Sequence, residues 1–468
     1  MSPANSFFPL FLTKKGPTVR AMQEVLQRIG EATTGTKDVV QNRLLAKALC
    51  NKMPCSILRD GRDKKPRILS IDMGIKNLAY CVADVEKPTP TRDSTHMNIR
   101  TWCRLDLSEA FRDYSLGGDQ KSLAKEAALE GREDEDLYTP QSLSRMAYWF
   151  LRKILSDWSP DIILIERQRW RSSGSPTIQQ WTVRVNTLEA TMWAVMETLK
   201  SERMKFLEWQ MYAVDPKRVG HFWLNGVTPA AEPKSARASK KKASKSSTKS
   251  EEDEEDIGKS EDEEAGSTKK LTRGKAEKKA KIQLLRSWLD SDNPSTTLSA
   301  SSNLANSENA YPNISFTFSH KERMASPTGY GADATRQALL YATDKPFERA
   351  RRTAYYKAYV SKVDDITDCF LQAAAWVAWG ENLRNLRPEV NELKAQVEGK
   401  LGRKMNVPWH LADAVKELQE KGPETNGPDG EVVKKTSNAR KTKMLKTKGA
   451  ASMATLNKQT KAKNKANR

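Results

Sequence analysis

The stretch that decides the fold is Ile68-Leu-Ser-Ile-Asp72-Met-Gly-Ile-Lys-Asn77, followed directly by Leu78-Ala-Tyr-Cys-Val-Ala-Asp-Val85. Residues 68–72 predict a short buried strand that ends in a carboxylate, and residues 78–85 predict a second strand. Gly74 supplies the backbone freedom that a tight turn between these strands requires. Residues 99–107 predict a third strand. An aspartate at a strand end is also a common turn former, so Asp72 alone does not establish a site.

A second carboxylate closes a later strand. Residues 143–158 carry apolar side chains at helical spacing, and Pro160 ends that helix. The run Asp161-Ile-Ile-Leu-Ile-Glu166 is typical of a buried parallel strand. Burying Glu166 is unfavourable unless a partner is present, and an ion pair with Arg167 or Arg169 is the simplest alternative to a site. A crossover helix over 185–199 and a strand over 206–214 are expected next.

The third group of carboxylates opens a helix at Lys362-Val-Asp364-Asp365-Ile-Thr-Asp368. Asp364 and Asp365 lie four and three positions before Asp368, so each can share a helix face with it. Residues 370–379 are apolar nearly all round, which predicts a buried helix. Carboxylates held this close raise one another's pKa unless a cation neutralises them. The alternative is that these are first-turn acids that suit the helix dipole.

The composition indicates a polyanionic partner. The 468 residues carry a formal charge of +20, with a pI near 9.5. These values favour nucleic acid first and an anionic membrane surface second. No apolar run reaches the roughly 18 residues of a membrane span, so no membrane partner is expected. The five cysteines form no C-x-x-C pair and the four histidines are scattered, which argues for a reducing compartment and against a zinc site or a Ser-His-Asp triad.

The N-terminal residues divide into two segments. Residues 1–17 carry basic residues and no acid, which fits a mitochondrial leader or a structured N-terminal arm. Residues 18–50 contain two amphipathic helical patterns separated by Gly30 and Thr34-Gly-Thr-Lys37. This segment resembles a SAP motif, a helical hairpin that binds duplex DNA. The resemblance implies a DNA contact for Lys37; an unrelated helical hairpin is the alternative.

The remaining domain organisation follows from changes in composition. We expect a catalytic core in two parts, at 66–227 and 282–385, separated by a disordered charged insert at 228–281. Residues 336–357 are basic and aromatic, which predicts either a nucleic-acid surface or a solvated helix face. A helical extension at 386–432 and a basic disordered tail at 433–468 complete the chain.

Three motifs together resemble the fungal mitochondrial Holliday-junction resolvases, the RuvC-like branch of the RNase H fold. They are Ser70-Ile-Asp72-Met-Gly-Ile-Lys-Asn-Leu-Ala-Tyr80, Ile165-Glu166-Arg-Gln-Arg169 and Lys362-x-Asp364-Asp365-x-x-Asp368, in the family's order. The resemblance implies an α/β fold, in which helices flank a mixed five-stranded RNase H-like sheet. It also implies a homodimer that cuts four-way DNA junctions. The expected localisation is the mitochondrial matrix or nucleoid, with the nucleus as the alternative.

The resemblance further implies roles for individual residues. The expected catalytic residues are Asp72, Glu166, Asp365 and Asp368, and the same residues together with Asp364 are the expected metal ligands. Oxygen ligands of this kind suit two Mg²⁺ ions, with Mn²⁺ able to substitute. DNA contacts are expected from Lys37, Lys76, Gln168, Arg169 and Arg171. Two other functions stay open: a nuclease for RNA–DNA hybrids, and a non-enzymatic DNA-packaging protein.

Overall fold

The computed structural model describes residues 8–13, 15–49, 65–89, 94–115, 137–169, 179–202, 209–224, 273–289, 296–297, 314–319, 331–341, 362–404 and 408–421. Several predictions lie outside these residues. They concern most of the insert at 228–281, Arg171, the basic aromatic segment beyond residue 341, and the tail at 433–468.

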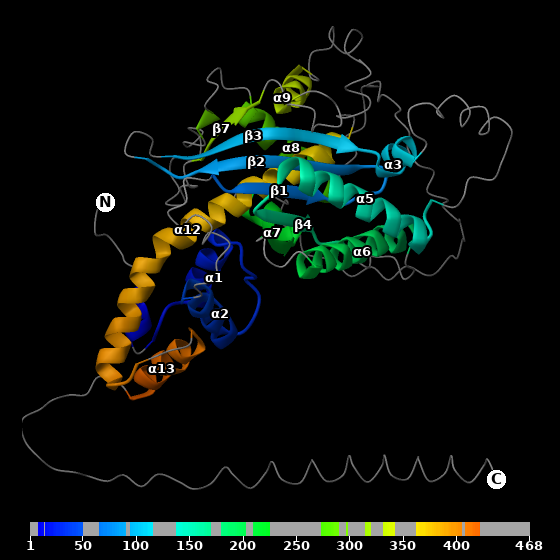
Figure 1. The fold of residues 1–468 in the computed structure, drawn as a ribbon. Helices are drawn as coiled ribbons and strands as arrows, with labels where there is room; N and C mark the ends of the chain where they lie inside the picture. The colour runs from blue at the N-terminus through cyan, green and yellow to red at the C-terminus, as the bar shows by residue number, and fades with distance from the viewer. Residues whose placement is uncertain are drawn as a thin grey trace, which may run out of the picture. The chain divides into compact units, whose positions relative to one another are not determined.

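One mixed sheet forms the centre of the fold (Figure 1). Its strands are β1 (Arg67–Asp72), β2 (Leu78–Glu86), β3 (Thr95–Leu105), β4 (Ile162–Glu166), β5 (Gln210–Val214), β6 (Thr296–Thr297) and β7 (Ile314–Phe318). They lie side by side in the order β5-β4-β1-β2-β3-β7-β6. Strand β2 runs antiparallel to its neighbours β1 and β3, whereas β4 is parallel to β1 and β5 is parallel to β4. β1 therefore lies in the interior of the sheet with a parallel and an antiparallel neighbour.

Side chains alternate between the two faces of the sheet, because successive residues of a strand point in opposite directions. From β1, Leu69 and Ile71 pack under α3 (Leu107–Ser115), α5 (Pro140–Trp158) and α6 (Gln180–Glu202). Ile68 packs on the opposite face under α7 (Pro216–Trp223), α8 (Arg273–Leu289), α9 (Ala332–Tyr341) and α12 (Val363–Leu401). Both faces are covered, so the strands are buried on two sides as their apolar sequences predict.

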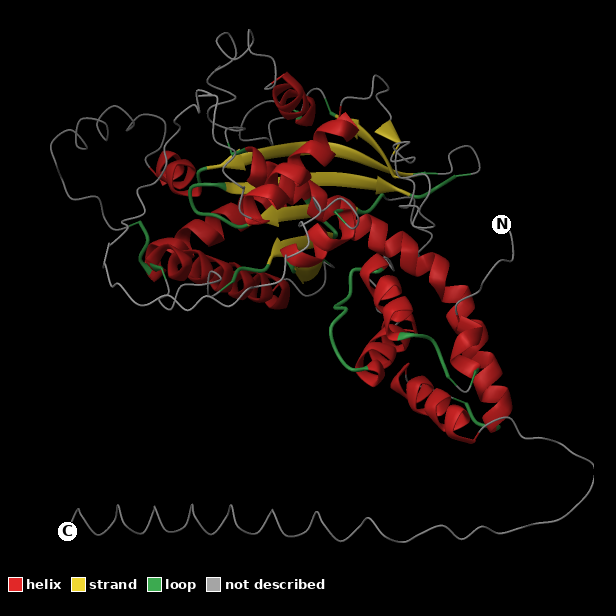
Figure 2. Ribbon diagram, turned by 180° about the vertical axis from the view of Figure 1, so that it is seen from behind, coloured by secondary structure: helices red, strands yellow, loops and turns green. Residues whose placement is uncertain are grey.

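A separate helical core lies along the second half of α12 (Figure 2). It joins the 3₁₀ helix η1 (Phe8–Leu12), α1 (Val19–Arg28), α2 (Lys37–Leu49) and α13 (Pro408–Lys421) to that half of α12. Phe11, Met22 and Leu44 are fully buried there. At 39 residues, α12 is about 58 Å long at 1.5 Å per residue. A single helix thus contributes side chains to both the sheet core and the smaller helical core.

The predicted α/β class, the helical hairpin and the first five strands are confirmed. The sheet has seven strands rather than five, because β7 and the short β6 extend it beyond β3. The end of the predicted insert at residue 281 is wrong, since α8 begins at Arg273 and buries Leu285 and Trp288 against the sheet. A boundary at 385/386 is also wrong, because α12 passes through it and through Pro388 without a break. Among the described residues, no helix is long and apolar enough to span a membrane.

Candidate active site

Asp72 and Glu166 are the last residues of the neighbouring parallel strands β1 and β4, so they lie at the same end of these strands. The register pairs Ile71 with Ile165, so the next residues along the two strands are Asp72 and Glu166. Ser70 points toward α12, where its Oγ donates a 2.8 Å hydrogen bond to the Cys369 carbonyl oxygen. Because side chains alternate along a strand, Asp72 points to the same face as Ser70. The two carboxylates therefore meet under the first turns of α12.

Asp368 completes the group from α12. One carboxylate oxygen from each of Asp72, Glu166 and Asp368 lies within 4.8 Å of the others. We call these three residues the carboxylate cluster. Asp72 is buried, whereas Glu166 and Asp368 are partly exposed. The cluster thus has a buried base and a side that solvent or a ligand can reach.

Buried hydrogen bonds fix the first turns of α12 over the sheet. Gln372 Nε2 donates to Ser70 Oγ at 3.1 Å. Trp102 Nε1 on β3 donates to the Ile366 carbonyl oxygen at 2.9 Å. These bonds, with the Ser70 bond to Cys369, come from two different strands. The position of Asp368 is therefore set by the sheet and not by its own helix alone.

The charges in this site are poorly neutralised by the protein. Burial raises the pKa of Asp72 well above its usual value, and Glu166, Asp365 and Asp368 raise it further. Burial and the charge of Asp368 raise the pKa of Glu166 to about 7. Burial and the charge of Asp364 likewise raise the pKa of Asp365 to about 7. A bound cation would remove this repulsion, because it favours the ionised carboxylates.

Asp364 and Asp365 differ in their surroundings. The Asp364 carboxylate accepts a 2.6 Å hydrogen bond from Lys278 Nζ on α8. Burial raises the pKa of Asp364, but Lys278 lowers it more, so the net shift is downward. Asp365, in contrast, acts electrostatically on both Asp72 and Glu166. Asp365 thus has the stronger electrostatic effect on Asp72 and Glu166 of the two.

The sequence analysis missed two lysines of α8 at this site. Lys278 pairs with Asp364, and Lys281 Nζ lies 3.0 Å from Asp368 Oδ1. One signal could have identified Lys281: it precedes Leu285 and Trp288 by four and seven positions, which places it on their apolar helix face. A lysine in such a position needs an acidic partner once the helix is buried.

The donor set fits a hard divalent cation. The cluster offers only carboxylate oxygens, the ligands that Mg²⁺ and Mn²⁺ prefer, and the upward pKa shifts mean that the ionised carboxylates would be stabilised by a cation. Asp72, Glu166 and Asp368 could each donate one oxygen, and Asp365, whose charge acts on Asp72 and Glu166, is a further candidate. The site is therefore suited to metal-assisted hydrolysis.

The predicted DNA contacts have different positions. Lys76 is exposed in the turn after Asp72, and Arg169 is exposed in the loop after Glu166. Gln168 is partly buried, and its backbone N–H donates to Glu189 at 3.1 Å. These three residues follow the two strand-end carboxylates directly. Lys37 is exposed at the start of α2, on the separate helical core, and donates to the Lys15 carbonyl oxygen at 2.8 Å.

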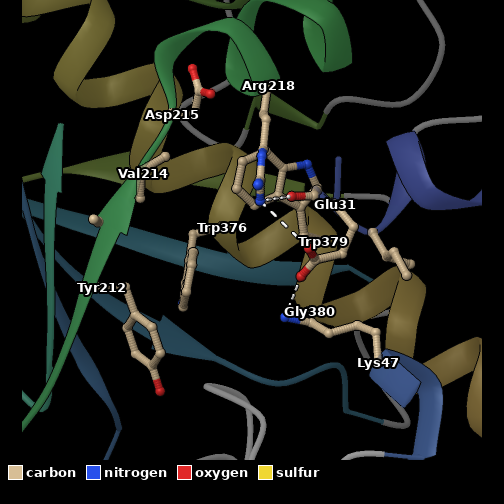
Figure 3. A pocket seen from close by; sticks show the side chains of 12 residues that line it. Glu31, Lys47, Tyr212, Val214, Asp215, Arg218, Trp376, Trp379 and Gly380 are labelled. Atoms are coloured by element: carbon tan, nitrogen blue, oxygen red, sulfur yellow. Dashed lines mark hydrogen bonds and ion pairs between the residues drawn. The ribbon is translucent and has the colours of Figure 1, made fainter. Parts of the chain in front are cut away.

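A pocket of about 180 Å³ lies where the α1–α2 hairpin meets β5, α7 and α12 (Figure 3). Arg218 on α7 donates to the Gly30 carbonyl oxygen at 3.1 Å and pairs with Glu31 at 3.5 Å. Lys47 on α2 pairs with the same glutamate at 2.5 Å. Trp379 packs directly on Gly30. These contacts join the hairpin to the sheet-containing part of the protein.

Comparison with known proteins places these features in a family. A curated relative is "Cruciform cutting endonuclease 1, mitochondrial" from Schizosaccharomyces pombe, 26% identical over 204 residues, which is 43% of this chain and 65% of the relative's length. The crystal structure of the yeast mitochondrial Holliday junction resolvase Ydc2 aligns with a TM-score of 0.39 at 18% identity, covering 80% of this chain and 98% of that one. Thermus thermophilus RuvC aligns with a TM-score of 0.21 at 13% identity, over 34% and 69% of the two chains.

The family model covers the sheet, except for the first residue of β1, and all three groups of catalytic candidates. It is described as "Mitochondrial resolvase Ydc2 / RNA splicing MRS1" and matches residues 68–386, more than half of the chain. The matched region includes Asp72, Glu166 and the acidic start of α12. The predicted family is thereby confirmed, and the chain belongs to the family of mitochondrial resolvase Ydc2 and RNA splicing MRS1.

Proposed function

We propose that this protein is a structure-selective endonuclease that resolves four-way DNA junctions by Mg²⁺-dependent phosphodiester hydrolysis. The observation that carries the proposal is the carboxylate cluster, in which three ligand oxygens lie within 4.8 Å of one another. The name of the Schizosaccharomyces pombe relative and the resolvase in the family description support the choice of substrate. The charge of +20 suits a polyanionic partner.

Asp72, Glu166, Asp365 and Asp368 would hold two Mg²⁺ ions, and Mn²⁺ is expected to substitute. Asp364 is the weaker candidate, because its pKa is shifted downward beside Lys278, whereas the pKa of Asp365 is raised to about 7 and would be relieved by a cation. When bound, the metal supplies Lewis-acid activation of water and stabilises the leaving 3′-oxygen. Lys76 and Arg169 would bind the phosphates on either side of the cut, and Gln168 and Arg171 are proposed as further DNA contacts. The fixed start of α12 would keep Asp368 aligned during the reaction, since its bonds to the sheet do not involve the metal.

A homodimer is the expected assembly. A four-way junction has two-fold symmetry, and paired cuts need two active sites in a matching arrangement. The α1–α2 hairpin would add duplex contacts through Lys37. The expected localisation is the mitochondrion, which the name of the relative supports.

Cleavage of three matched substrates tests the proposal. Synthetic four-way junction, linear duplex and RNA–DNA hybrid would be incubated with the full chain and Mg²⁺. We expect paired nicks in the junction alone, lost in Asp72→Asn while junction binding persists. Asp113→Asn, which removes an exposed carboxylate from α3, is the matched control and should cut normally.

Each alternative function gives a different result in the same assay. Cleavage of the hybrid with the junction left intact would identify a hybrid nuclease. Junction binding without any cleavage would indicate a packaging protein. Tight binding of structured RNA without cleavage would instead point to the splicing branch named in the family description.

A further inference from the structure

Helix α8 brings a buried cation into the proposed metal site. Lys281 Nζ lies 3.0 Å from Asp368 Oδ1 and 3.9 Å from Glu277 Oε1, and the lysine side chain is only 9% exposed. Lys278, one helical turn earlier, pairs with Asp364 at 2.6 Å but is 59% exposed. Both lysines therefore form an ion pair with an aspartate of α12, but Lys281 is buried and Lys278 is exposed to solvent.

The position of Lys281 is fixed by the packing of α8. Leu285 and Leu289 are each 1% exposed and belong to the sheet core. The Trp288 ring lies 4.9 Å from that of Trp223 on α7 and stacks on Phe316 of β7 at 6.0 Å. Lys281 cannot move far from this position, because α8 is packed against both α7 and β7.

The Lys281 ammonium lies between acidic groups of two helices. Its Nζ is within ion-pair distance of Asp368 on α12 and of Glu277 on α8. A cation held beside a carboxylate neutralises part of its charge. Lys281 thus offsets charge at Asp368, one of the three residues of the carboxylate cluster.

We propose that Lys281 is a positioning residue that competes with the divalent cation for Asp368 and so lowers the metal affinity of the carboxylate cluster. In the absence of metal, the ammonium holds Asp368 beside Asp72 and Glu166. When metal takes the Asp368 oxygen, the ammonium is released next to the site. There it can bind a phosphate of the DNA backbone, a second role that rests on the proposed function.

Competition has a consequence that can be measured without DNA. Removing a positive charge beside a metal ligand leaves the cluster more negative, so a divalent cation should bind more tightly. By Coulomb's law, a unit charge about 4 Å from a divalent cation changes its affinity by about tenfold or more, even at the dielectric constant of water. Lys278 should have a smaller effect, because its direct partner Asp364 lies outside the cluster and solvent screens the pair, so only its longer-range charge acts on Asp368.

The experiment is a Ca²⁺ titration of the full chain, followed by thermal unfolding in the absence of DNA. Lys281→Met should melt below the wild type without metal, and Ca²⁺ should raise its melting temperature at a concentration about tenfold lower. Lys278→Met is the matched control and should shift the Ca²⁺ midpoint much less than Lys281→Met does. Lys281→Arg, which keeps the charge, should restore the wild-type midpoint.

Two outcomes would overturn the proposal. Equal Ca²⁺ midpoints for Lys281→Met, Lys278→Met and the wild type would mean that the lysine does not compete with metal. If Lys281→Met does not fold without metal, the titration is made with Lys281→Gln, which can still hydrogen-bond to Asp368. An unchanged midpoint in that neutral variant would likewise exclude competition by charge.

Junction cleavage by the wild type separates this inference from the proposed function. If the wild type does not cut junctions but the midpoints differ as expected, the proposed function fails and the competition stands. If the wild type cuts junctions and the midpoints are equal, the competition fails and the proposed function stands. Slower cutting by Lys281→Met at saturating Mg²⁺ would support the phosphate-binding role, and an unchanged rate would exclude it.

Discussion

Substituting Gly30 by alanine should separate the α1–α2 hairpin from the sheet-containing part of the protein. Gly30 follows the last turn of α1 with a φ of +70°, which L side chains rarely adopt. Its N–H bonds to the Gln27 carbonyl oxygen, and the Glu31 N–H bonds to that of Leu26, the pattern of a Schellman cap. An alanine Cβ would lie 2.5 Å from Cε2 of the Trp379 indole and closer still to Cδ2 and Cε3.

The expected loss of stability has two parts. A left-handed conformation costs a non-glycine residue about 1–2 kcal/mol. Overpacking against a side chain that cannot move adds about 1–3 kcal/mol. Trp379 is only 7% exposed and packs against Phe222 and Trp376, so it has little room to retreat. Gly30→Ala should therefore lower the free energy of unfolding by about 2–5 kcal/mol.

Two other glycines separate these contributions. Gly402 has a φ of +64° with nothing within 4 Å of an added Cβ, so Gly402→Ala should cost only the left-handed part, about 1–2 kcal/mol. Gly399 lies inside α12 in open space, and Gly399→Ala should stabilise the helix by about 0.5–1 kcal/mol. Urea titrations followed by tryptophan fluorescence would measure all three. Equal losses in Gly30→Ala and Gly402→Ala would refute the contact between the hairpin and Trp379.

Three further predictions concern the catalytic core. The free energy of unfolding of the metal-free protein should fall as pH rises from about 4.5 to about 7, because Glu166 and Asp365 have folded pKa values of about 7, above their unfolded values. Urea titrations across this pH range should show the fall, and a flat profile would contradict the burial of these carboxylates. Ser159→Gly should raise the free energy of unfolding by about 0.5–1 kcal/mol, because Ser159 ends α5 with a φ of 44°, which glycine adopts more readily. A higher urea midpoint would show it. Ser70→Ala should lower stability by about 1–3 kcal/mol in the same assay, because it removes two buried hydrogen bonds, one to the Cys369 carbonyl oxygen and one from Gln372 Nε2. A neutral effect would show that α12 does not depend on these bonds.

The two strand-end carboxylates could be predicted from sequence because local patterns identify them. Asp72 and Glu166 each close a run of apolar residues, and the strand period alone places both on the face opposite to Ile71 and Ile165. The place of Asp368 in its helix could also be predicted, because acidic residues followed by a helix that is apolar nearly all round indicate a buried helix with a charged first turn. Their proximity in space is what the structure adds.

The parts that were missed depend on contacts between distant segments. Ile314–Phe318 is a short strand next to Ser- and Asn-rich residues, and it becomes a strand by pairing with β3. Lys281 stands at the end of a lysine-rich run that resembles a solvated segment, and the acidic groups around it, Asp368 above all, make its burial favourable. The boundary at residue 385 failed because Pro388 normally ends a helix. Here Leu383 and Val390, on either side of it, are both buried in the smaller core.

The place of α12 in the chain affects the order in which the protein can fold. Ser70 and Cys369, joined by a buried hydrogen bond, are 299 residues apart in sequence. Contacts of such long range form slowly, because the entropy of closing the intervening chain is lost before the contacts stabilise the fold. The hairpin near the N-terminus also depends on α12, which supplies Leu383 and Val390 to its core. A nascent chain that ends before α12 thus holds Asp72 and Glu166 without Asp368, so the carboxylate cluster should assemble only late in synthesis.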